Sequence, residues 1–104
     1  MRFTPLSETN LKNRVIDFLR KEYPRAWFYK SAGRWTSGIP DLILCINGMF
    51  YAIELKVGRN DPTKIQEYVL NRIQSAGGRA VVCRSVDEVK EFLKKGGAQN
   101  DQDW

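Results

Sequence analysis

The dipeptide Asn47-Gly48 constrains the fold of this chain most strongly, because it separates two apolar, β-rich runs. Asn-Gly favours a two-residue type I′ turn, in which both central residues take positive φ. Such a turn predicts an antiparallel hairpin with a fixed register. The expected cross-strand pairs are Ile46 with Met49, Leu44 with Tyr51, Leu42 with Ile53, and Asp41 with Glu54.

This register gathers three charges at the open end of the hairpin. Asp41 and Glu54 lie opposite each other on one face, and Lys56 follows on the same face two residues later. Like charges in opposite positions destabilise a hairpin, and a divalent cation would offset that cost because hard cations prefer oxygen ligands. The alternative is an ion pair between Lys56 and one carboxylate at a sheet edge. The hairpin alone leaves both interpretations open.

Helices are expected on both faces of the sheet, because the hairpin is otherwise apolar on both of its faces. The flanking sequence predicts the order α-β-β-β-α-β-α, an α/β fold with a mixed sheet. The other expected elements are a helix from the N-cap Ser7 to about Glu22, a strand over 26–30, a helix from the N-cap Asp61 to about Ala76, a strand over 79–84, and a helix opened by a Ser85–Glu88 capping box and ended at Gly96.

Composition narrows the possible functions. The 104 residues suit one domain, and no run approaches the roughly 20 apolar residues of a membrane span. Cys45 and Cys83 lie in apolar runs, which predicts two buried thiols and a cytoplasmic protein. There is no histidine, so His-based metal sites, Ser-His triads and Cys-His dyads are excluded. The net charge of +5 favours nucleic acid as the partner, against the simpler interpretation of a basic soluble protein.

Two further polar residues occupy first-turn positions on core-facing helix stripes. Glu8 precedes Leu11 by three residues, so it is either a third site carboxylate or an acid that complements the helix dipole. Gln66 begins the stripe of the second helix, where it either supports the site or faces solvent.

The loop before Asp41 contains Arg34 and Trp35 between two glycines. Such a pair can grip a phosphate and stack on a base. Trp35 can equally fold onto the core or form a dimer contact. The full set of candidate nucleic-acid contacts is Lys30, Ser31, Arg34, Trp35, Arg59 and Lys64.

The combination of Pro40-Asp41 with Glu54-Leu55-Lys56 resembles the PD-(D/E)XK nuclease signature. The finer pattern resembles the VRR-NUC family in the small stand-alone form found in phages and bacteria. It consists of Glu8, Gly38-Ile39-Pro40-Asp41, Ala52-Ile53-Glu54-Leu55-Lys56, Asp61-Pro62-Thr63-x-x-Gln66 and Gly77-Gly78. The resemblance implies a restriction-endonuclease-like αβββαβ core with an extra C-terminal helix. The resemblance covers roughly residues 7–93. We expect one nuclease domain over residues 1–97, followed by a polar, acidic and disordered tail over 98–104.

The resemblance also implies site roles. Asp41, Glu54 and the backbone carbonyl of Leu55 hold Mg²⁺ or Mn²⁺, and Glu8 reaches the metal directly or through water. Lys56 orients or deprotonates the attacking water. Gln66 supports the site from the second helix.

The implied activity is that of a metal-dependent, structure-specific DNA endonuclease similar to Holliday-junction resolvases, acting as a homodimer on four-way junctions. No membrane partner and no nucleotide cofactor are expected, and the implied location is the interior of a phage host or bacterial cell. Two alternatives stay open. One is a non-catalytic basic nucleic-acid-binding module, and the other is a restriction-like or RNA-directed nuclease on the same fold.

Overall fold

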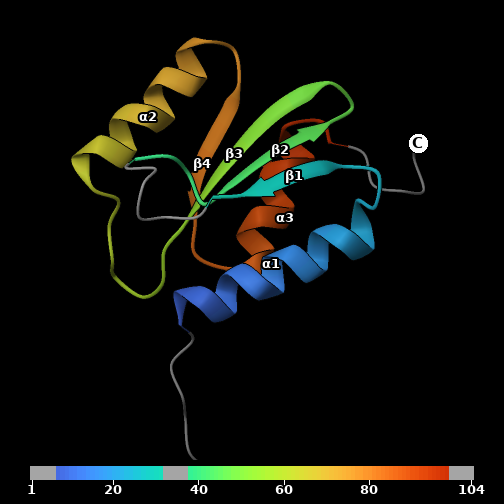
Figure 1. The fold of residues 1–104 in the computed structure, drawn as a ribbon, viewed down its shortest axis with the longest axis horizontal. Coiled ribbons are helices and arrows are strands. Elements are labelled where there is room, and N and C mark those ends of the chain that lie inside the picture. Colours follow the sequence, from blue (N-terminus) through green and yellow to red (C-terminus); the bar gives the residue numbers. More distant parts are fainter. Residues whose placement is uncertain (1–6, 32–37, 99–104) are drawn as a thin grey trace, which may run out of the picture.

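The computed structural model describes residues 7–31 and 38–98. Arg34, Trp35 and the tail beyond Ala98 therefore lie outside the described residues. Helix, three strands, helix, strand and helix follow one another as predicted (Figure 1). The elements are α1 (Glu8–Glu22), β1 (Trp27–Lys30), β2 (Leu42–Ile46), β3 (Met49–Leu55), α2 (Lys64–Ser75), β4 (Arg79–Cys83) and α3 (Val86–Lys95).

The four strands form one mixed sheet in the order β1-β2-β3-β4. The first two pairings are antiparallel, and β3 pairs with β4 in parallel. The hairpin register is the predicted one, with Leu44 opposite Tyr51 and Leu42 opposite Ile53. Asn47 and Gly48 have φ values of 53° and 80°, as a type I′ turn requires.

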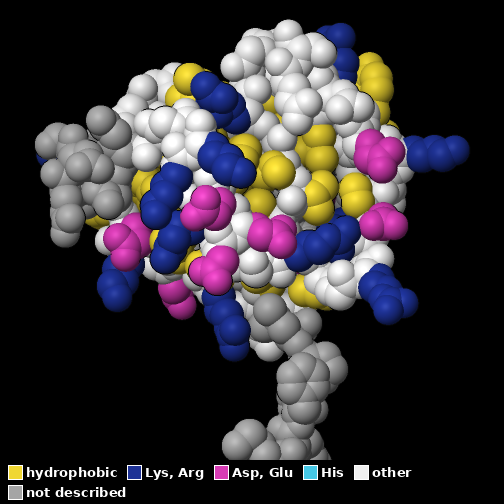
Figure 2. Space-filling view, turned by 180° about the vertical axis from the view of Figure 1, so that it is seen from behind, with side chains coloured by type: hydrophobic (Ala, Val, Ile, Leu, Met, Phe, Trp, Pro, Cys, Tyr) yellow, Lys and Arg dark blue, Asp and Glu magenta, His cyan; other side chains and the backbone are white. Residues whose placement is uncertain are grey.

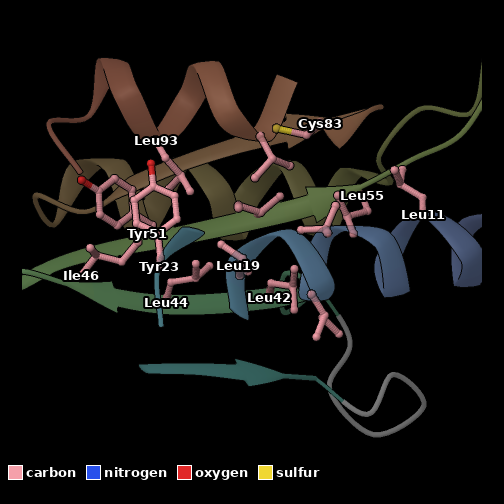
Figure 3. Packing of buried hydrophobic residues seen from close by; sticks show 14 residues of the cluster. Leu11, Leu19, Tyr23, Leu42, Leu44, Ile46, Tyr51, Leu55, Cys83 and Leu93 are labelled. Atoms are coloured by element: carbon pink, nitrogen blue, oxygen red, sulfur yellow. The ribbon is translucent and has the colours of Figure 1, made fainter. Parts of the chain in front are cut away.

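The main core lies between the sheet and the pair of helices α1 and α3. Every second hairpin residue points into it, and these residues are at most 1% exposed: Leu42, Leu44, Ile46, Tyr51, Ile53 and Leu55. Leu11 and Leu19 from α1 and Leu93 from α3 belong to the same cluster (Figure 3). Burial of this apolar surface fixes where α1 lies against the hairpin, and hence where its first turn points.

The opposite face of the sheet is covered only in part. Leu70 of α2 packs against Ala52 and Ala80 of the two adjoining strands. Cys45 of β2 remains exposed, which corrects the prediction of two buried thiols. The reason is that α2 packs mainly on β4 and not on β2. Cys83 is buried, and burial together with the charge of Glu88 raises its pKa to about 12.

The helix starts follow local capping chemistry. Ser7 caps α1 as predicted, its hydroxyl accepting a hydrogen bond from the Asn10 N–H at 3.0 Å. The predicted cap of α2 was wrong, because Thr63 and not Asp61 is the N-cap. The Asp61 carboxylate instead pairs with Arg84 at 3.2 Å. None of the helices in the described ranges is both long and apolar enough to cross a membrane.

Candidate active site

Contacts with two other segments hold the chain just before β2 in place, and they thereby position Asp41. Gly38 has a φ of +80°, and a Cβ there would come within 2.8 Å of the Ile65 side chain on α2. Only glycine combines this backbone conformation with this close approach. On the other side, the Ser31 N–H donates to the Asp41 carbonyl oxygen at 2.9 Å. Asp41 is therefore held at the point where β2 begins.

Asp41 and Glu54 form a carboxylate pair at the open end of the hairpin. The two carboxyl groups interact directly, and each shifts the pKa of the other. The Leu55 N–H also donates to Asp41 Oδ2 at 2.8 Å. Glu54 is only 2% exposed, and its Oε2 atom has no hydrogen-bond partner within the described part of the chain. An unpartnered buried carboxylate oxygen is costly unless a ligand completes it.

The pKa values of the two carboxyl groups are shifted in opposite directions. The pKa of Glu54 is raised to about 9, first by burial and then by the hydrogen bond and charge of Asp41, against the opposing charge of Lys56. Burial also acts to raise the pKa of Asp41, but the hydrogen bonds from Glu54 and Leu55 and the charge of Lys12 outweigh it. The pKa of Asp41 therefore lies below its ordinary value. Two adjacent carboxylates with opposite shifts are characteristic of a functional site.

Two lysines approach the pair in different ways. Lys12 of α1 forms an ion pair with Asp41, with Nζ 3.4 Å from Oδ1. Lys56 is half-buried and its charge acts on Glu54, yet among the described residues no ion pair within 4 Å involves it. The sequence analysis missed Lys12. Its position four residues after Glu8 could have indicated it, because this spacing places both residues on the same side of the helix.

The two residues predicted to support the site, Glu8 and Gln66, have different surroundings in the structure. Glu8 is in the first turn of α1, and its charge contributes to the raised pKa of Glu54. Within the described ranges, however, no cluster of three or more Asp, Glu or Cys residues is close enough together to hold a metal ion. Gln66 completes a capping box at the start of α2, where its Oε1 accepts from the Thr63 N–H at 2.8 Å.

The candidate nucleic-acid contacts among the described residues are mostly exposed. Lys30 lies at the end of the edge strand β1, Arg59 in the loop after β3, and Lys64 at the start of α2. Ser31 differs, because it is buried and holds the backbone of Asp41.

The donor set fits a divalent metal of the Mg²⁺ type. Mg²⁺ is usually bound through one or two carboxylates, with water and phosphate as its other ligands. Asp41 and Glu54 provide two carboxylates, and Glu54 Oε2 has no hydrogen-bond partner among residues 7–31 and 38–98. Leu55 would add its backbone carbonyl, next to the N–H that already holds Asp41.

This arrangement defines the class of protein. A buried Glu54 beside a half-buried Asp41 at the end of a hairpin, with a lysine two residues beyond, on a helix-flanked mixed sheet, is the PD-(D/E)XK nuclease arrangement. The VRR-NUC domain model matches residues 2–87. The chain therefore belongs to the VRR-NUC domain family, one of the PD-(D/E)XK nuclease families.

Solved structures agree with this assignment at the level of the fold. A structure described as a VRR-NUC domain is 19% identical with a TM-score of 0.69, covering 84% of this chain and 94% of its own. A VRR-NUC domain protein is 20% identical with a TM-score of 0.73, covering 89% of both chains. The comparison with curated proteins gives no match.

Proposed function

We propose that this protein is a Mg²⁺- or Mn²⁺-dependent endodeoxyribonuclease that hydrolyses phosphodiester bonds in branched DNA, with the four-way junction as its leading substrate. One observation carries the catalytic part of the proposal. The carboxyl group of Glu54 is buried beside that of Asp41, and one of its oxygens has no partner among the described residues. This arrangement is costly for folding and suited to holding a hard cation.

Asp41, Glu54 and Lys56 would have different roles in hydrolysis. Asp41 and Glu54 would hold the ion, and a bound divalent metal would supply a nucleophilic hydroxide at neutral pH and shield the phosphate charge. The Lys56 ammonium would orient the attacking water or stabilise charge on the phosphate. Lys56 suits this role because no carboxylate within 4 Å binds it in the described part of the structure.

The distribution of charge and the small size of the domain bear on how it would recognise DNA. The face seen in Figure 2 intermixes acidic and basic side chains around an apolar area. The net positive charge of the chain therefore does not form one continuous patch on that face. So small a domain has little surface for reading bases in a groove, which favours recognition of DNA shape and backbone. Symmetric cleavage of a junction further needs two active sites, and hence a homodimer.

The test is a cleavage assay on a labelled four-way junction and on a linear duplex of the same sequence. Each substrate is incubated with Mg²⁺, Mn²⁺ or EDTA, with Asp41→Asn as the inactive control. We expect metal-dependent cutting of the junction that is lost in Asp41→Asn. Equal cutting of both substrates would remove the junction preference. Tight binding without cutting in either metal would favour the non-catalytic binding module. A monomer in sedimentation with junction present would contradict the dimer.

A further inference from the structure

Lys12 lies beside the carboxylate pair and forms an ion pair with Asp41. Its Nζ lies 3.4 Å from Asp41 Oδ1, and the two side chains are only 23% and 17% exposed. Water therefore screens this ion pair less than it would screen one on an open surface. Lys12 is not part of the nuclease sequence pattern, in which Glu8 is the residue from this end of α1.

The two oxygens of Asp41 are both engaged. Oδ2 accepts the hydrogen bond from the Leu55 N–H, and Oδ1 faces the Lys12 ammonium. The backbone bond is fixed by the strand, whereas the lysine lies at the end of a flexible four-carbon stem. A metal ion that binds Asp41 would therefore compete for Oδ1 with Lys12 and leave the backbone bond in place.

We propose that Lys12 is a positioning residue. Its ammonium takes the position of a cation next to Asp41 in the metal-free protein and moves away when a divalent ion binds. This inference rests on the proposed metal-dependent function. Its physical basis is that an ammonium and a divalent ion on one carboxylate oxygen repel each other at short range. In the metal-free protein, Lys12 lowers the cost of a half-buried Asp41 carboxylate and keeps the side chain in position.

A thermodynamic consequence follows for metal loading. Every metal-binding event must break the Lys12–Asp41 ion pair, so the lysine weakens the affinity of the site for metal. A DNA phosphate offers the displaced ammonium a new partner. Metal and DNA should then strengthen each other's binding, and part of this coupling should depend on Lys12.

The experiment measures Mn²⁺ binding to the full chain by calorimetry, without DNA. Lys12→Met removes the ammonium and keeps most of the apolar stem. Lys21→Met is the matched control, because it removes the same charge from an exposed position in the last turn of α1. We expect Lys12→Met to bind Mn²⁺ about tenfold more tightly and Lys21→Met to stay within about twofold of wild type. Unchanged or weaker binding in Lys12→Met would overturn the proposal.

A second variant decides the matter if Lys12→Met fails to fold. Lys12→Arg keeps the charge and can grip the carboxylate with two N–H groups. It should therefore weaken Mn²⁺ binding severalfold, and unchanged or tighter binding would contradict the displacement. The cleavage assay separates the two proposals. If wild-type protein cuts with Mg²⁺ and the Lys12 variants bind metal like wild type, only the role of Lys12 fails. Absence of Mn²⁺ binding in every variant would overturn both.

Discussion

The two faces of the β2–β3 hairpin differ in how completely they are covered. The face toward α1 and α3 carries six apolar residues that are at most 1% exposed. The face toward α2 includes Ala52, which is fully buried, and Cys45 and Phe50, which are exposed, and it ends in the Asp41–Glu54 pair. One face is thus closely packed, whereas the other keeps a buried carboxylate oxygen that has no hydrogen-bond partner among the residues the structure describes. The difference indicates that stability and chemistry are assigned to opposite sides of the same two strands.

The largest expected effect is on the charged face. Glu54→Gln keeps the size of the side chain and resembles its protonated form, but it cannot supply an anionic ligand. We expect cleavage to fall by about a thousandfold or more while the fold is kept. Single-turnover cleavage and circular dichroism measure the two quantities. Cleavage at the wild-type rate would show that Glu54 is not in the active site.

The next effect contrasts neighbouring residues on opposite faces. Leu44→Ala should reduce the free energy of unfolding by about 2–5 kcal/mol, because it leaves a cavity in a fully buried cluster. Ile43→Ala, on the half-covered face, should cost about 1 kcal/mol. Urea denaturation of both variants tests the contrast, and equal losses would mean that the two faces pack alike.

The pH dependence of stability should isolate Glu54. Its pKa in the folded state, about 9, lies above its ordinary value of 4.5, so the folded protein retains the proton more strongly. This contribution to stability is complete below the ordinary value and is lost as the pH rises through the folded value. We expect the metal-free wild type to lose stability relative to Glu54→Gln across this window. Urea midpoints at several pH values measure the difference, and parallel curves would contradict the raised pKa.

Metal should reverse that trend, because a bound divalent ion stabilises the ionised carboxylate. With saturating Mg²⁺, the wild-type protein should gain stability toward alkaline pH, and Glu54→Gln should gain little. The same urea series with and without Mg²⁺ provides the measurement. Equal stabilisation of both proteins would place the metal elsewhere.

The smallest effect concerns Gln66, which serves a helix cap in the structure. Gln66→Glu preserves the capping box and removes the amide N–H groups, so stability should change by less than about 0.5 kcal/mol. If Gln66 also supports the site, cleavage should fall by about 10–100-fold. Gln66→Ala, which loses both functions, should in addition cost about 1 kcal/mol of stability. Wild-type cleavage by Gln66→Glu would limit this residue to the cap.

Much of the fold was predictable because its signals are local. Asn47-Gly48 specifies the turn, the turn specifies the register, and the register places Asp41 near Glu54. The start of α1 at Ser7 follows in the same way from side-chain chemistry next to the helix. Asp61 shows the limit of this approach. It carries a favourable capping sequence, but Arg84, more than twenty residues later in the chain, pairs with its carboxylate.

By itself, the sequence determined the hairpin, its register, the order of elements and the two carboxylates at one end. These features depend on neighbours along the chain or across one tight turn. Only the tertiary structure decided that Lys12 pairs with Asp41, that Glu54 Oε2 is buried with no partner in the described part of the chain, and that Cys45 stays exposed. The physical reason is that each of these depends on where a helix lies against the sheet. That placement follows from packing of the whole core, which no local pattern contains.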